Sequence, residues 1–247
     1  SEDYRRMEVA VIEETDKEFN DEVAVPDSLM KTRGEISDPS LPFTLRVREY
    51  HENAALSMRG AGAPSIVTAG VGSGMAFAPR PPVTADGEQN TSVAIVEPVL
   101  KNGTSLGVFL LSNGLGAPQG FVHEGRSWKL ALRLRRYRHP FSLTLKDFKH
   151  DRYPGTNIPK NFSSLVRLKD PRAGDDRDVL IYMNSPLRHG GLTFYQASFG
   201  KDDTLSVLQV VRNPAWTLPY VSCRLGALGL LWHFGVMLKK SLGARPA

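Results

Sequence analysis

Apolar and polar residues alternate with a period of two along much of the chain, which is the pattern of half-buried β-strands. Within residues 43–50, Phe43, Leu45 and Val47 share one face of such a strand. The same alternation governs residues 127–137, through Trp128, Leu130, Leu132 and Leu134, and residues 141–148, through Phe141, Leu143 and Leu145. Further β-rich runs are Met7–Ile12, Leu106–Leu111, Leu165–Leu168, Val179–Met183, Thr193–Ala197 and Leu205–Val211.

About ten short strands with turn residues between them, and few helical patterns, predict a mainly β fold. We expect an antiparallel sandwich or an open barrel. A short helix is expected after Val25-Pro26, with Asp27 or Ser28 as its N-terminal cap. In the strand around Phe194 and Tyr195, neighbouring side chains point to opposite faces, so one should pack in the core and the other should be more exposed.

Residues 54–92 differ in kind, because they are rich in Ala, Gly and Pro and poor in large apolar side chains. This composition predicts a long loop or flexible insertion. Residues 70–74 read Gly-Val-Gly-Ser-Gly, but no Lys-Ser/Thr pair follows, so they do not form a phosphate-binding loop.

Residues 216–238 form an apolar segment of a length that can cross a bilayer. Trp216 and Tyr220 fit an aromatic belt at the outer boundary, where Arg224 can also reach the interface. Lys239-Lys240 and Arg245 follow, as expected on a cytoplasmic side. The alternative is an amphipathic helix docked on the core. We favour a transmembrane helix.

A span at this position places residues 1 to about 215 outside the cytoplasm, anchored to the cytoplasmic (inner) membrane. The chain starts without Met or a leader peptide, so we expect a fragment of a longer membrane protein. The expected organisation runs from an acidic β part to a loop or insertion, a main β domain, the transmembrane helix and a cytoplasmic tail, in residues 1–53, 54–92, 93–213, 214–240 and 241–247.

Charge is distributed unevenly along the 247 residues. Residues 1–53 carry 7 basic and 14 acidic side chains, a net charge of −7, whereas residues 54–247 carry 24 and 12, a net charge of +12. A basic surface suits an anionic partner such as lipid headgroups or carboxylate-bearing ligands. No nucleic-acid recognition motif is present, so nucleic acid is not an expected partner.

The single cysteine, Cys223, excludes an intramolecular disulfide framework and a Cys-based zinc site. It also excludes covalent haem attachment to this chain, because no Cys-x-x-Cys-His motif occurs. The histidines show no metal-ligand spacing, so no metal site is expected.

From Phe141 onward, the sequence resembles the ResB-like family of membrane proteins in the System II pathway of cytochrome c biogenesis. The resemblance covers about residues 141–238, extends more weakly to residues 25–29 and 41–50, and is absent from 54–92. Its most specific pieces are Tyr153-Pro154-Gly155-Thr156, Asn184-Ser185-Pro186-Leu187, Gly190-Gly191, Phe194-Tyr195-Gln196 and Leu208-Gln209-Val210 with Asn213-Pro214.

The resemblance implies an extracytoplasmic domain that assists haem delivery and presents apocytochrome c to a haem-handling membrane protein of the cytochrome c synthase complex. Haem is then a transient cofactor, and a thioredoxin-like reductant is a further partner. The chain itself is expected to be a non-catalytic subunit rather than an enzyme. The segments that carry the resemblance have the chemistry of turns and packed strands.

Two residues of the apolar segment are candidates for chemistry. His233 lies where ionisable groups are rare, and a neutral imidazole is a good axial ligand for haem iron. Its alternative role is a hydrogen bond to a neighbouring helix. Cys223 lies beside Arg224, whose positive charge favours a thiolate, the form of cysteine that takes part in thiol–disulfide exchange. The alternative for Cys223 is a small apolar packing residue.

Arg133, Arg135, Arg136 and Arg138 form a basic run that is a candidate surface for lipid phosphate, haem propionates or an acidic partner. Its simpler interpretation is the solvated face of an edge strand. For the whole chain, the alternative to an assembly factor is a membrane-anchored β-sandwich that binds glycan or peptide. A hydrolase would need a pair of carboxylates that sequence alone does not identify.

Overall fold

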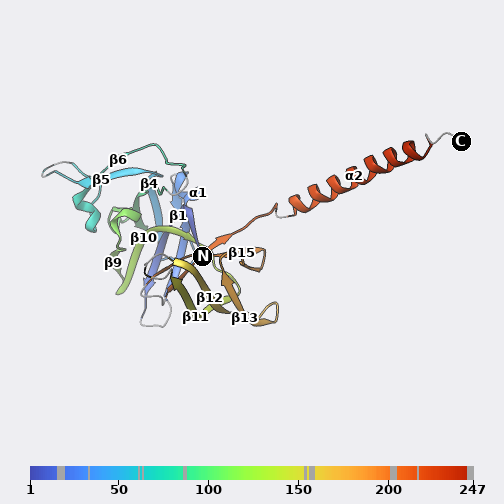
Figure 1. Ribbon diagram of the computed structural model, residues 1–247. Coiled ribbons are helices and arrows are strands. Elements are labelled where there is room, and N and C mark those ends of the chain that lie inside the picture. The colour runs from blue at the N-terminus through green and yellow to red at the C-terminus, as the bar shows by residue number, and fades with distance from the viewer. Residues whose placement is uncertain are drawn as a thin grey trace. The chain divides into compact units, whose positions relative to one another are not determined.

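Antiparallel strands make up most of the chain in the computed structural model. The structure describes residues 1–243 apart from 16–19, 33, 61, 63, 86–87, 153–154, 156–158, 201–204 and 216. Within these residues lie sixteen strands and two α-helices, and the chain divides into two compact units, Ser1–Arg138 and His139–Ala247 (Figure 1). The predicted mainly β, antiparallel fold is confirmed.

Two four-stranded sheets form the first unit, with strand orders β2-β1-β10-β9 and β3-β4-β7-β8. Both sheets contribute apolar side chains to one core, so this unit is a sandwich. Its elements are β1 (Glu2–Glu14), β2 (Asp21–Pro26), α1 (Asp27–Lys31), β3 (Glu35–Ile36), β4 (Phe43–His51), β5 (Ala54–Met58), η1 (Val71–Gly74), β6 (Met75–Pro79), β7 (Val93–Leu100), β8 (Phe109–Ser112), η2 (Asn113–Leu115), β9 (Gln119–His123) and β10 (Arg126–Arg136).

Apolar and polar residues alternate along β10, and the apolar ones are buried as predicted. Trp128, Leu130 and Leu132 are buried in the core, whereas the residues between them are only partly buried. β10 is not an edge strand, because it pairs with β1 on one side and β9 on the other. Phe43 of the facing sheet packs edge-on against Trp128, with ring centroids 5.1 Å apart.

β7 is buried on both of its faces. Ala94 and Val96 face the sandwich core, while Val93 and Ile95 belong to a second cluster on the other side of the sheet. The hairpin β5–β6 contributes to that second cluster. The structure therefore differs from the loop expected over residues 54–92: part of this segment forms a paired hairpin that covers β7 and β8.

The short helix after Val25-Pro26 is present as α1, but its cap differs from the prediction. Pro26 occupies the N-cap position, and no side chain caps the helix. Asp27 lies in the first turn, where its side chain is buried instead of reaching back to the backbone. Pro26 has the extended backbone that an N-cap residue adopts, with φ of −69° and ψ of 156°.

The second unit contains two three-stranded antiparallel sheets with orders β11-β12-β13 and β14-β15-β16. Val166, Ile181 and Phe194 from the two sheets share a buried cluster. Phe194 is 4% exposed and Tyr195 is 40% exposed, as the opposite faces of their strand predict. The elements are β11 (Ser142–Arg152), β12 (Pro159–Asp170), β13 (Asp175–Tyr182), β14 (Leu187–His189), β15 (Leu192–Gly200), β16 (Leu205–Val211) and α2 (Leu218–Gly243).

α2 is the long helix drawn in red in Figure 1. Residues Leu218–Leu242 are long and apolar enough to cross a membrane, with a mean hydropathy of 1.4. Because none of the most apolar stretch is buried against the rest of the protein, a docked amphipathic helix does not describe it. Trp216 and Arg245, which the sequence placed at the two boundaries, lie outside the described residues.

Candidate functional site

The candidate residues Cys223 and His233 both lie on α2 but do not form one site. They are ten residues apart, which is about 15 Å along a helix axis. Arg224 and His233 are nine residues apart, so they lie on opposite faces of the helix. The thiol of Cys223 is exposed, and the ring of His233 packs edge-on against Phe234 with centroids 5.7 Å apart.

His233 shares its helix face with two glycines. Gly226 and Gly229 precede it by seven and four residues, spacings that bring positions onto the same face. A Cβ at either glycine would meet no heavy atom within 4 Å. This face therefore allows a neighbouring helix to approach the backbone close to the imidazole.

Within the basic run of β10, Arg133 is held by two carboxylates of the acidic N-terminal strands. Its guanidinium donates to Glu8 and to Glu22, each at 2.9 Å, and its side chain is 16% exposed. Glu22 also accepts from Arg138 at 2.5 Å. Burial alone would raise the pKa of Glu22, but the hydrogen bonds and charges of Arg133 and Arg138 outweigh it and hold that pKa below its usual value.

The other two members of the run differ in their partners. Arg136 pairs with Glu2 at 2.9 Å. Arg135 instead lies over the ring of Tyr137, 5.2 Å from its centroid, in a cation–π contact. The acidic N-terminal segment thus neutralises most of the basic run within the first unit, and Arg135 is the member whose described contacts include no carboxylate.

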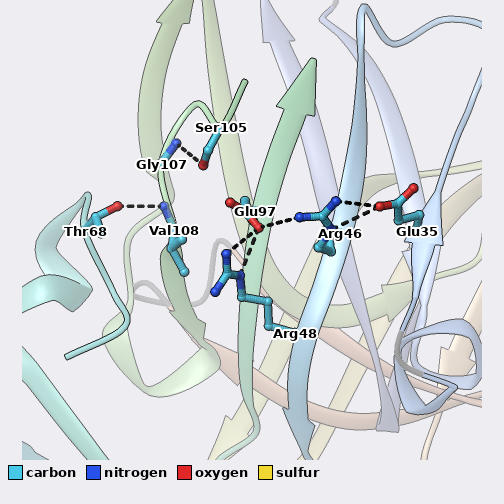
Figure 2. A network of polar contacts seen from close by, with 8 residues as sticks. All are labelled: Glu35, Arg46, Arg48, Thr68, Glu97, Ser105, Gly107 and Val108. Carbon is cyan, nitrogen blue, oxygen red and sulfur yellow. Dashed lines mark hydrogen bonds and ion pairs between the residues drawn. The ribbon is translucent and has the colours of Figure 1, made fainter. Parts of the chain in front are cut away.

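A second polar network, which sequence reasoning missed, lies on the sheet of β4 and β7 (Figure 2). Glu97 is almost fully buried and accepts from Arg48 at 2.9 Å and Arg46 at 3.4 Å. Arg46 also donates to Glu35 at 2.7 Å. Burial alone would raise the pKa of Glu97, but a hydrogen bond from Ser105 and the two arginines hold that pKa below its usual value. The two arginines and two carboxylates balance in charge.

His189 is a largely buried polar residue of the second unit, with its side chain 11% exposed. Its Nε2 lies 2.8 Å from Asp170 Oδ2 and its Nδ1 lies 3.7 Å from Asp175 Oδ2. The ring of Phe141 packs edge-on against the imidazole at 4.8 Å. Both ring nitrogens therefore face carboxylates, which leaves this histidine a structural role. Among the residues that the structure describes, no cluster of metal-ligating side chains occurs.

Of the resemblance motifs that the structure describes, Asn184 and Gly190-Gly191 lie in turns, whereas Phe194-Tyr195-Gln196 lies in β15 and Leu208-Gln209-Val210 lies in β16. Gly190 and Gly191 have φ of 58° and 76° and connect β14 to β15, the geometry of a two-residue hairpin turn. Asn184 adopts φ of 67° in the turn closed by Tyr182 and Ser185. Tyr153, Pro154 and Thr156 of the remaining motif lie outside the described residues.

A cavity of about 440 Å³ opens in the first unit. Asp27, which is 9% exposed, lines it, and its Oδ1 has no hydrogen-bond partner among the described residues. Burial raises the pKa of Tyr50, on another wall, to about 12. The charged lining residues are of both signs and include Arg6, Lys31, Glu52 and Glu88.

A mainly β domain followed by one apolar helix that can cross a membrane defines the class: a membrane-anchored β protein. Residues 106–211 match the ResB-like family, which confirms the resemblance drawn from the sequence. The match begins earlier than Phe141 and ends at Val211, so it does not include residues 212–238 of the expected range.

This chain is also similar in sequence to three known proteins. The chain is 38% identical over 94 residues to protein NrfI of Wolinella succinogenes, covering 38% of this chain and 10% of the relative. It is 34% identical over 133 residues to cytochrome c biogenesis protein CcsB of Synechococcus sp. strain CC9605, covering 52% and 29%. The CcsB protein of Synechococcus elongatus is 34% identical over 94 residues, covering 38% and 20%. The chain thus covers from about a tenth to just under a third of the length of these three relatives.

Proposed function

We propose that this chain is the membrane-anchored, extracytoplasmic part of a cytochrome c maturation factor. It assists haem delivery and presents apocytochrome c to a haem-handling membrane protein of the synthase complex, and it is a non-catalytic subunit. The observation that carries the proposal is the ordered match over residues 106–211, which leads directly into α2. Two of the relatives carry the name cytochrome c biogenesis protein.

The proposed topology puts residues 1 to about 215 outside the cytoplasmic membrane. Lys239 and Lys240 end the apolar stretch of α2, and a cluster of cations is typical of a cytoplasmic boundary. Arg224, six residues into α2 from Leu218, is close enough to the other end to extend its guanidinium to the headgroups.

In this role His233 supplies one imidazole to haem. Its position on a glycine-lined helix face fits that role, because a partner helix can close around the ring. Imidazole would donate to the iron and raise its electron density when haem is bound. α2 contains one histidine, so the partner would supply the remaining protein contacts to the haem.

Cys223 is proposed as a thiol that exchanges with the client. Its thiolate would attack a client disulfide, form a mixed disulfide and release one client thiolate. A thioredoxin-like reductant would then resolve the mixed disulfide and regenerate the thiolate. The exposure of Cys223 near the domain end of α2 supports this position.

The basic run is proposed to meet an anionic group, whether lipid phosphate, haem propionate or an acidic partner. Since Arg133, Arg136 and Arg138 already pair with carboxylates, Arg135 is the residue best placed to add such a contact. Its stacking on Tyr137 leaves the guanidinium edge able to donate.

A haem-peroxidase stain of membranes from cells that lack the full-length gene tests the assembly role. We expect covalent c-type cytochromes to vanish while the absorbance of b-type haem persists. C-type cytochromes at wild-type level, in a cell without a second maturation pathway, would overturn the proposal.

The cavity of the first unit favours a second candidate function, a binding module for glycan or peptide. The buried Oδ1 of Asp27, which has no hydrogen-bond partner among the described residues, and lining charges of both signs suit a polar ligand. This function predicts saturable binding of a glycan or peptide that Asp27→Ala abolishes, with normal c-type cytochromes in the deletion strain.

A further inference from the structure

Strand β16 presents an unprotected edge. It ends the sheet β14-β15-β16 and pairs only with β15 among the described strands. Its seven residues, Leu205–Val211, contain no charged side chain and no proline. An edge strand offers a row of backbone N–H and C=O groups to any chain that can pair with it.

The other long edges of the described sheets carry the usual protection. β11 has a bulge between Leu145 and Asp147 and several charged residues. β13 contains three aspartates and an arginine, and β2 combines acidic residues with a terminal proline. Edge strands without charge or proline, such as β5 and β9, have only five residues. β16 is thus the longest unprotected edge among the described strands.

The side chains of β16 also favour strand pairing. Leu205 and Val207 are 44% and 43% exposed on the outer face of the sheet, and most of the remaining residues are β-branched or leucine. A long, apolar and uncharged edge is an aggregation hazard unless another strand covers it. The edge of β16 is therefore a surface to which an extended chain can pair.

We propose that β16 binds an extended, unfolded polypeptide by strand addition, and that this polypeptide is the client of the maturation role; this inference rests on the proposed function. Strand addition joins main-chain groups, so it holds unfolded chains of different sequence. The neutral side chains of β16 impose no charge preference. Six residues separate Val211 from Leu218, so a strand bound here lies within about 25 Å of the start of α2.

Hydrogen exchange by NMR on the full chain in lipid nanodiscs tests the proposal directly. The probe is a synthetic peptide with the haem-attachment motif in its Ser-x-x-Ser-His form, which prevents disulfide exchange. We expect alternate backbone amides within Leu205–Val211 to exchange about tenfold more slowly when peptide is present, because only every second N–H points to the free edge.

A matched pair of variants distinguishes binding at the edge of β16 from binding to the outer face of the sheet. Val207→Lys places a charge on the edge strand, whereas Tyr195→Lys places the same charge on the outer face of the central strand β15. We expect Val207→Lys to weaken peptide binding about tenfold or more, and Tyr195→Lys to leave it nearly unchanged. Far-UV circular dichroism and the melting temperature of each variant establish that both remain folded.

Three results would overturn the proposal: amides of β16 that are unaffected by peptide, equal weakening by both variants, or slow exchange that rises with protein concentration and needs no peptide. The last result would mean that a second copy of the chain covers the edge. Peptide-dependent protection in a protein whose deletion spares c-type cytochromes would keep the edge site and reject the maturation role.

Discussion

His189 is bonded to Asp170 across nineteen residues of chain, with Nε2 and Oδ2 2.8 Å apart. The other oxygen of Asp170 accepts from the backbone amides of Arg172 and Ala173 at 2.9 and 3.2 Å. One carboxylate thus shapes the turn between β12 and β13 and also ties it to β14. The hydrogen bond from His189 and these amides hold the pKa of Asp170 below its usual value.

Asp170→Ala is expected to lower the melting temperature of the second unit, because it removes all three hydrogen bonds. A lowered pKa in the folded state means that Asp170 stabilises the protein above its unfolded pKa of about 3.9, and that this contribution disappears as pH falls through the folded value. The difference in melting temperature from wild type should be present at pH 6 and shrink below about pH 4. Asp147→Ala, at an exposed position of β11, is the control.

Gly72→Ala tests whether the Gly-rich segment is packed. A Cβ on Gly72 would lie 2.6 Å from the carbonyl oxygen of Leu110, whereas a Cβ on Gly74 would meet nothing within 4 Å. We expect Gly72→Ala to lower the free energy of unfolding by about 1–3 kcal/mol and Gly74→Ala to change it much less. Chemical denaturation measures both. If both variants changed the free energy of unfolding by the same small amount, the segment around Gly72 would be a flexible insertion and not packed against β8.

Arg133→Met should lower the free energy of unfolding far more than Arg135→Met. It leaves the buried carboxylate of Glu8 without its cation, which costs about 3–5 kcal/mol for a buried pair. Arg135→Met loses only the contact with Tyr137, worth about 0.5–1 kcal/mol. The two free energies of unfolding at pH 7 decide this. A larger loss for Arg135→Met would contradict the assigned pairing.

His233→Ala in the full-length protein is expected to reduce the haem that copurifies with the complex, and to shift its Soret band. Cys223→Ala should leave the haem content unchanged and slow only the reduction of a client disulfide, since the two residues lie about 15 Å apart along α2. Pyridine haemochrome absorbance measures the first effect. Leu231→Ala, two residues before His233 and so on the far side of α2, is the control.

The sequence predicted strands where one face is buried and the other is not, as in β10 and β11. It missed β7, because a strand buried on both faces has no alternation to detect. It also missed the hairpin β5–β6, whose small residues suggest a loop until a neighbouring sheet gives them a surface to cover. The order of apolar and polar residues within one strand does not show whether another element covers its second face.

The candidate site was predictable only in part. The apolar segment that carries His233 and Cys223 was evident from length and hydropathy. The pairing of Arg133 with Glu8 and Glu22 was not, because it joins residues more than a hundred positions apart. The available signal for this pairing was the uneven charge of the chain, which is acidic in residues 1–53 and basic in the remainder. In the first unit, acidic side chains of residues 1–53 pair with arginines of β10.

The uncharged stretch of α2 between Arg224 and Lys239 has fourteen residues, or about 21 Å of helix. A hydrocarbon layer is about 30 Å thick, so the uncharged stretch alone does not span it. Either the side chain of Arg224 extends to the headgroups or the bilayer thins around the helix. A tether so short would restrain the vertical position of the β domain. The client strand, if it pairs with β16, would then be held at nearly constant depth relative to the lipid surface.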